Sequence, residues 1–138
     1  MRRARPARRR PARTALLLIG HGSRVGPANR ILRGIARALR TRFAGRVIEA
    51  CYLEAAPPDV QTGIDRCVAR GATRVLCIPY FLFLGGHVRR DLPRAAALAR
   101  RRHPGLGVRI ARHLGGDRRL VAIVADRARR ALRAGGWR

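Results

Sequence analysis

Short apolar runs alternate along this chain with segments in which apolar residues recur at the spacing of a helix. Four of the runs are apolar almost throughout, a pattern typical of strands that are buried on both faces. They are residues 14–19, 47–53, 74–79 and 107–111. A segment with helical periodicity follows each run, so the pattern predicts a parallel sheet with helices packed on both of its faces.

Proline and glycine divide these segments. Pro27 is placed to open the first helix, and Pro57-Pro58 to open the second, since proline is tolerated in the first turn. The third helix is expected within residues 88–102. Asp117 is a good N-cap for the last helix, whose apolar residues are expected to face the core. Those residues are Leu120, Val121, Val124 and Leu132.

The order of elements predicts an α/β fold class: a three-layer open sheet of four parallel strands, doubly wound as in flavodoxin-like proteins. The length of 138 residues suits one domain with one core. Residues 1–13 contain seven arginines and no acidic residue, and we expect them to be a disordered arginine-rich tail. Residues 14–138 are expected to form a single domain.

The net charge of +25 is unusual for a protein of this size. Every basic residue is arginine, and residues 14–138 still contain 25 arginines against seven acidic residues. An arginine bias together with abundant alanine and glycine is typical of a GC-rich genome, yet the charge still favours anionic partners such as polycarboxylates, phosphates or nucleic acid.

Three cysteines, Cys51, Cys67 and Cys77, show no C-x-x-C spacing. Their odd number and their positions in apolar segments predict free, buried thiols and neither a disulfide framework nor a zinc site. No segment approaches the roughly 20 apolar residues that span a membrane, and the apolar run after the tail is too short for a signal peptide. We therefore expect a cytoplasmic protein.

Three polar residues follow three successive strands. His21 lies in the segment Gly20-His21-Gly22, His87 follows Gly85-Gly86, and Glu54 is 33 residues from each histidine. The carboxyl ends of parallel strands meet at one edge of a sheet, so we expect these side chains to lie together. Two imidazoles and a carboxylate are good ligands for Co²⁺, Fe²⁺, Ni²⁺ or Zn²⁺, and three protein ligands leave coordination positions open.

Other candidate residues carry weaker signals. His103 and His113 lack the glycine-flanked setting and are not expected to bind metal. The glycines of residues 20–26 match neither G-x-G-x-x-G nor the P-loop. The aromatic run 80–83 is more typical of core than of a ligand-binding wall.

The motifs around the three residues resemble those of the class II tetrapyrrole chelatases, in particular the small, single-domain sirohydrochlorin type. The resemblance covers about residues 14–125. It is carried by Gly20-His21-Gly22-Ser23-Arg24, Tyr52-Leu53-Glu54, Pro79-Tyr80-Phe81-Leu82, Gly86-His87-Val88 and Asp91-Leu92-Pro93.

This resemblance implies insertion of Co²⁺ or Fe²⁺ into sirohydrochlorin, toward cobalamin or sirohaem. It implies that His21, Glu54 and His87 are metal ligands or proton acceptors, and that the protein is a homodimer whose clefts face each other. The metal, Co²⁺, Fe²⁺ or Ni²⁺, would be a substrate, with no permanently bound cofactor. We expect the substrate's carboxylates to be bound near Ser23, Arg24, Arg89 and Arg90.

Two other functions stay open at this point. The charge and the tail fit an arginine-rich nucleic-acid-binding module, although no nucleic-acid motif is present and aromatic residues make up only 4% of the chain. A metallochaperone would use the same histidines and glutamate without chemistry. Turnover of a tetrapyrrole distinguishes a chelatase from both.

Overall fold

The computed structural model describes residues 11–137 and contains four strands and four helices within that range. Each strand is followed by a helix, as the sequence pattern predicts. The elements are β1 (Thr14–Gly20), α1 (Gly26–Arg42), β2 (Ile48–Tyr52), α2 (Val60–Ala69), β3 (Arg74–Pro79), α3 (Gly86–Arg102), β4 (Gly107–Ile110) and α4 (Arg118–Ala134).

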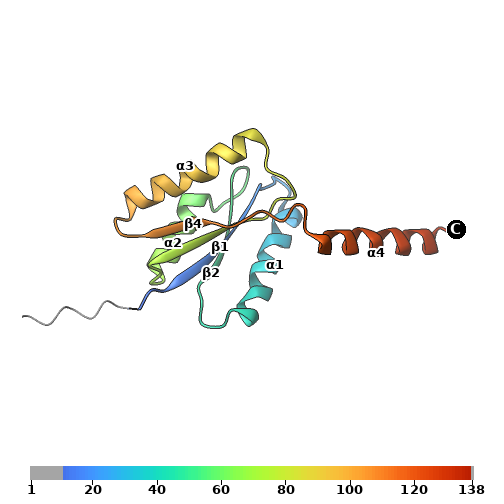
Figure 1. Cartoon of the computed structure of the whole chain (residues 1–138), viewed down its shortest axis with the longest axis horizontal. Helices are drawn as coiled ribbons and strands as arrows, with labels where there is room; N and C mark the ends of the chain where they lie inside the picture. Colours follow the sequence, from blue (N-terminus) through green and yellow to red (C-terminus); the bar gives the residue numbers. More distant parts are fainter. Residues whose placement is uncertain (1–10, 138) are drawn as a thin grey trace, which may run out of the picture.

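The sheet has the strand order β2-β1-β3-β4, and every neighbouring pair is parallel. The chain moves outward from β1 to β2 and then crosses back to β3. Right-handed connections in opposite directions place their helices on opposite faces, so α1 covers one face and α2 and α3 the other (Figure 1). The carboxyl ends of β1 and β3 therefore border the switch point at which open α/β sheets bind ligands.

Alternating side chains of the central strands build two apolar layers. Leu17 and Ile19 of β1 pack with α2 and α3, whereas Leu16 and Leu18 pack with α1. Gly63 of α2 allows that helix to lie close to the sheet, because a Cβ there would lie 2.9 Å from Cβ of Cys51. The predicted α/β class with helices on both faces is confirmed.

The last helix departs from the prediction. In the described chain α4 has no buried residue, and Val121 and Val124 are 69% and 67% exposed. The expectation that Leu120, Val121, Val124 and Leu132 face the core is wrong, because α4 extends away from the sheet instead of folding back on it (Figure 1). Helical periodicity predicts an apolar face but not the surface that the face meets.

Two boundaries also differ from the expected ones. Pro57 and Pro58 are joined by a cis peptide bond in the turn before α2, and the helix begins at Val60 after Asp59, whose side chain accepts a hydrogen bond from the Thr62 N–H. Arg13, placed in the predicted tail, donates its N–H to the Thr73 hydroxyl and accepts a hydrogen bond from the Thr73 N–H at its carbonyl. Residues 1–10 lie outside the described residues.

The three cysteines are free and buried. Among residues 11–137, none of the helices combines the length and the apolar character needed to cross a lipid bilayer.

Candidate metal centre

The pairing of β1 with β2 brings His21 and Glu54 together. Backbone hydrogen bonds continue beyond the last strand residues: the Leu53 N–H donates to the Gly20 carbonyl and the Glu54 N–H to the His21 carbonyl, each at 3.0 Å. The two residues are thereby aligned side by side at the carboxyl edge of the sheet. Nε2 of His21 then lies 2.8 Å from Oε1 of Glu54.

Gly22 makes this close approach feasible. Its φ of +95° lies in the left-handed region, and a Cβ at this position would lie 1.8 Å from the Glu54 carbonyl oxygen. A side chain here would have to displace the backbone that carries Glu54, since no rotamer changes the position of a Cβ. The glycine that follows His21 is therefore required by the backbone of its metal-site neighbour.

A buried asparagine holds the loop that carries His21. Asn29 Oδ1 accepts a hydrogen bond from the Ser23 N–H, and Asn29 Nδ2 donates to the Ser23 carbonyl at 2.7 Å. The Tyr52 hydroxyl, itself buried, donates to the Asn29 carbonyl. Residue 23 is thus fixed to α1 and, through Tyr52, to β2.

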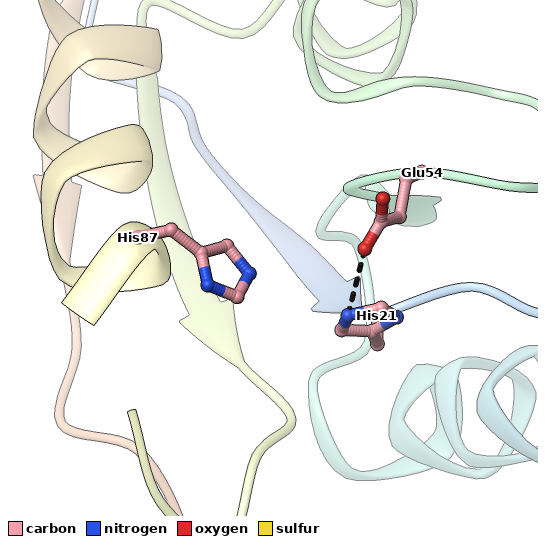
Figure 2. A group of neighbouring side chains, drawn as sticks. All are labelled: His21, Glu54 and His87. Atoms are coloured by element: carbon pink, nitrogen blue, oxygen red, sulfur yellow. Dashed lines mark ion pairs between the residues drawn. The ribbon is translucent and has the colours of Figure 1, made fainter. Parts of the chain in front are cut away.

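His87 approaches the pair from the other side of the switch point. It lies in the first turn of α3, which Gly85 precedes as N-cap, and its ring faces the His21–Glu54 pair (Figure 2). The ring of Phe81 meets the His21 ring edge to face, with centroids 6.4 Å apart. This contact limits the tilt of the His21 imidazole on the side of the loop after β3.

The three side chains form a set of potential metal ligands. One ligand atom from each of His21, Glu54 and His87 lies within 4.8 Å of the other two. Around a metal with bonds of about 2.1 Å, tetrahedral ligand atoms lie about 3.4 Å apart, so small side-chain rotations complete the approach. The side chains of His21 and Glu54 are 53% and 59% exposed, which leaves the open coordination positions accessible to solvent and substrate.

The other residues expected to bind substrate differ in their surroundings. Arg24, Arg89 and Arg90 are exposed in the two segments that carry His21 and His87, and none of them forms an ion pair within residues 11–137. Arg89 Nε donates to the Leu84 carbonyl at 3.3 Å. The Ser23 hydroxyl accepts a hydrogen bond from the Val25 N–H, which gives it a role in the turn.

The two remaining histidines lie outside the set. His103 Nε2 lies 2.6 Å from Oδ1 of Asp65 at the end of α3, and Arg102 binds the other oxygen of the same carboxylate. His113 is half-buried in the connection between β4 and α4. Neither histidine belongs to the group of potential metal ligands.

The apolar run after β3 was expected in the core, and for most of its length that expectation is wrong. Leu82 and Phe83 are 60% and 78% exposed and Tyr80 is 38% exposed, whereas Phe81 and Leu84 pack against the core. The run leaves the sheet after Pro79 and forms an apolar surface beside the metal-ligand set. Its length beyond a normal strand, followed by Gly85-Gly86, was the one sequence signal for this loop.

The chain was compared with known proteins. A family profile described as CbiX matches residues 15–131. The chloroplastic sirohydrochlorin ferrochelatase of Arabidopsis thaliana is 30% identical over 117 residues, which cover 85% of this chain and 52% of the relative. The sirohydrochlorin cobaltochelatase of Methanopyrus kandleri is 27% identical over 86% of this chain and 96% of its own length.

Among solved structures, the sirohydrochlorin chelatase SirB from Bacillus subtilis subspecies spizizenii, in complex with cobalt, superimposes with a TM-score of 0.78 and 30% identity. The match covers 85% of this chain and 50% of that structure. The chain thus spans about half the length of several of the curated relatives it matches, such as the Arabidopsis protein.

Proposed function

The chain belongs to the CbiX family, and we propose that it is a sirohydrochlorin chelatase, which inserts a divalent metal ion into that tetrapyrrole. The observation that carries the proposal is the convergence of His21, Glu54 and His87 at the switch point of the sheet. Relatives over most of this chain are named sirohydrochlorin ferrochelatase or cobaltochelatase, which supports the same reaction.

Metal insertion requires two tasks of the protein. The incoming ion must be held on one side of the macrocycle while it loses its bound water, and the two pyrrole N–H protons that it replaces must be accepted. Imidazole suits both tasks, because its ordinary pKa of about 6.5 lets it bind a metal or take a proton near neutral pH.

We assign both tasks to the three converging residues. His87 and His21 hold the ion together with Glu54, whose negative charge offsets the repulsion that a strongly cationic protein exerts on a metal cation. As the ion passes to the macrocycle, its protein ligands are released. The His21 imidazole and the Glu54 carboxylate, 2.8 Å apart, are then placed to accept the released protons.

The surroundings of the site fit a flat, polycarboxylate macrocycle. The exposed side chains of Leu82 and Phe83 offer an apolar surface for the ring system. Arg24, Arg89 and Arg90 lie on the segments that carry the two histidines and are free to bind peripheral carboxylates. Ser23 shapes the loop between them.

The remaining expectations belong to the same proposal. The metal, Co²⁺, Fe²⁺ or Ni²⁺, is a substrate, no cofactor is permanently bound, and the product leads toward cobalamin or sirohaem. Residues 14–138 act as one domain, which pairs with a second copy so that the two sites face each other. Nucleic acid is not a specific partner in this proposal.

The test is anaerobic incubation of the protein with sirohydrochlorin and each metal ion, followed by absorbance. We expect acceleration over the uncatalysed rate with at least one metal. The double substitution His21→Ala, His87→Ala should remove that acceleration without unfolding the protein, because both side chains are exposed.

His113→Ala is the matched control, since it removes an imidazole that is not part of the metal-ligand set, and its activity should equal that of the parent. If no metal is inserted faster than in the absence of protein, the proposed function is wrong. If metal binds tightly to the trio but no tetrapyrrole reacts, the protein is a metallochaperone.

A further inference from the structure

Helix α4 presents an apolar face on which no residue is buried by the described chain. Six of its apolar residues recur at i, i+1, i+4, i+8, i+11 and i+12, which places them on one side of a helix. They are Leu120, Val121, Val124, Ala128, Ala131 and Leu132. No residue of α4 is buried, and Leu132, near the end of the helix, is still 42% exposed.

The sheet has an uncovered area of matching character. On the α2 and α3 side, Val75 and Cys77 of β3 are 1% and 3% exposed. On the other face, Leu76 and Ile78 of the same strand are only half-buried, because α1 lies over β1 and β2. Strand β3 is thus covered by α2 and α3 on one face and is partly open on the other. The open face extends over the β3–β4 half of the sheet.

The two surfaces match in length. A helix of 17 residues is about 25 Å long, and the six residues of β3 extend over about 20 Å. The helix that follows the last strand of a doubly wound sheet is the natural cover for this half, since α2 and α3 occupy the other face.

The connection to α4 directs the helix away from its own sheet. The Ala111 N–H donates to the Cys77 carbonyl, and the Leu114 N–H donates to the Phe81 carbonyl. Gly115 packs so closely on the Leu82 carbonyl that a Cβ would lie 1.7 Å from that oxygen. Residues 111–115 are therefore fixed to the strand edge, and α4 continues outward past the edge that bears the metal-ligand set (Figure 1).

We propose that α4 covers the open β3–β4 face of a second copy of this chain, and that the second copy's α4 covers the first in return. In a two-fold symmetric exchange, the apolar face of α4 and the open β3–β4 face are buried in both copies. The symmetry closes the dimer, so no unpaired surface remains to recruit a third copy. Because each helix starts at its own carboxyl sheet edge and runs along the partner's sheet, the exchange sets the two metal-site edges against each other.

This inference deepens the homodimer of the proposed function, on which it rests, by naming the element that joins the copies. The exchange of α4 would also connect the dimer interface to the metal-ligand set. The fixed segment 111–115 contacts Phe81 and Leu82, and Phe81 contacts the ring of His21. Exchange of α4 would hold the loop beside the metal-ligand set in place from both copies.

Cross-linking distinguishes a partner's sheet from the helix's own. The full chain would carry Val124→Cys in one preparation and Ile78→Cys in a second, and the mixture would be treated with a short bismaleimide. The native thiols are buried, and burial raises the pKa of Cys67 to about 12 and that of Cys77 to about 11, so they react slowly. We expect a covalent dimer that contains one chain of each kind.

A chain that carries both substitutions gives the decisive comparison. Cross-links between chains support the exchange, whereas a cross-linked monomer shows that α4 folds back on its own sheet and overturns it. If light scattering shows a dimer but this cross-link never forms, the exchange of α4 is wrong. That outcome does not contradict a face-to-face dimer or the chelatase activity. A protein that is monomeric yet active fails only the inference and the dimer, not the chelatase.

The association can also be weakened selectively. Val124→Asp places a charge in the apolar face at both symmetric contacts, and we expect it to raise the dimer dissociation constant about 100-fold, about tenfold for each contact. Ala122→Asp adds the same side chain to the polar side of the helix and should change the dimer dissociation constant less than about threefold.

The fluorescence of Trp137 gives a second readout. Trp137, the only tryptophan, is 76% exposed after α4, and its emission should shift to the red when Val124→Asp separates the copies. Equal effects of the two substitutions would contradict the inference.

Discussion

Two residues of the site region show how strongly single positions are constrained. Gly22 is fixed by the Glu54 carbonyl oxygen, which occupies the space that a Cβ would need. The adjacent His21 is fixed by the same backbone ladder and by the ring of Phe81. The glycine next to the candidate metal ligand His21 reflects close backbone approach and a left-handed φ, not flexibility.

Gly22→Ala should therefore damage both stability and the metal centre. We expect a loss of about 1–2 kcal/mol in the free energy of unfolding from the positive φ alone, and Co²⁺ affinity at least about tenfold lower because Glu54 must move. Denaturant unfolding and titration calorimetry measure the two effects. Gly26→Ala is the control, because a Cβ there meets nothing within 4 Å. An unchanged Co²⁺ affinity in a folded Gly22→Ala variant would show that Gly22 does not position Glu54.

The buried thiols make stability fall at alkaline pH. Burial raises the pKa of Cys77 to about 11 from its usual 9.0, so the unfolded chain ionises this thiol before the folded chain does. The stabilising effect is complete below about pH 9 and is lost as the pH rises toward about 11. We expect the melting temperature to fall between about pH 9 and about pH 11, and Cys77→Ala to lessen that fall. If the melting temperature of Cys77→Ala falls by the same amount, the alkaline loss of stability arises from other groups.

At the scale of elements, the loop between β1 and α1 is held by α1 and β2 together. Asn29 is 8% exposed and binds both the N–H and the carbonyl of Ser23, while its own carbonyl accepts from the Tyr52 hydroxyl. A buried amide that satisfies a loop backbone converts a mobile connection into a defined one. The position of His21 thus depends on contacts made several residues away.

Substitution of Asn29 tests how much its hydrogen bonds to Ser23 stabilise the loop between β1 and α1. Asn29→Ala leaves two polar groups of Ser23 without their partner, and we expect a loss of about 2–4 kcal/mol in the free energy of unfolding. Tyr52→Phe removes only the hydrogen bond to the Asn29 carbonyl and should cost about 1 kcal/mol. Denaturant unfolding measures both. Losses of equal size would mean that the Ser23 contacts contribute little.

At the scale of the whole molecule, a net charge of +25 surrounds a site that, in the proposed function, must attract both a metal cation and an anionic macrocycle. Glu54 is the one acidic member of the metal-ligand set. The overall field favours the macrocycle, and its effect falls with ionic strength because salt screens exposed charges. In the proposed function, the metal would therefore be bound by the three local ligands, and the macrocycle would be attracted by the distributed positive charge.

Reversal of charge near the site tests this division. Arg24→Glu, Arg89→Glu and Arg90→Glu together should raise the KM for sirohydrochlorin at least about tenfold at low salt, with a smaller effect at high salt. The control reverses three arginines nearer the opposite edge of the sheet, Arg37, Arg42 and Arg66. Steady-state kinetics with both triple variants measures the effect. An equal rise in KM in the two would show that only total charge matters.

Much of this arrangement is contained in the sequence. The apolar runs predict the strands, and β3 has the expected ends at Arg74 and Pro79. The positions of His21, Glu54 and His87 after three successive strands predict that they meet, because the carboxyl ends of parallel strands share one edge. These inferences succeed because they depend on local pattern and on a general rule of topology.

Other features were decided only in three dimensions. The sequence shows that α4 has an apolar face, but not that this face leaves the sheet, since periodicity carries no information about which surface lies opposite. The exposure of Leu82 and Phe83 likewise depends on where the chain leaves β3. The need for glycine at position 22 arises from the Glu54 carbonyl, 32 residues away in the chain. The sequence by itself thus determines the elements and the residues that chemistry requires, whereas the tertiary structure determines contacts between distant segments, because those depend on the packing of the whole chain.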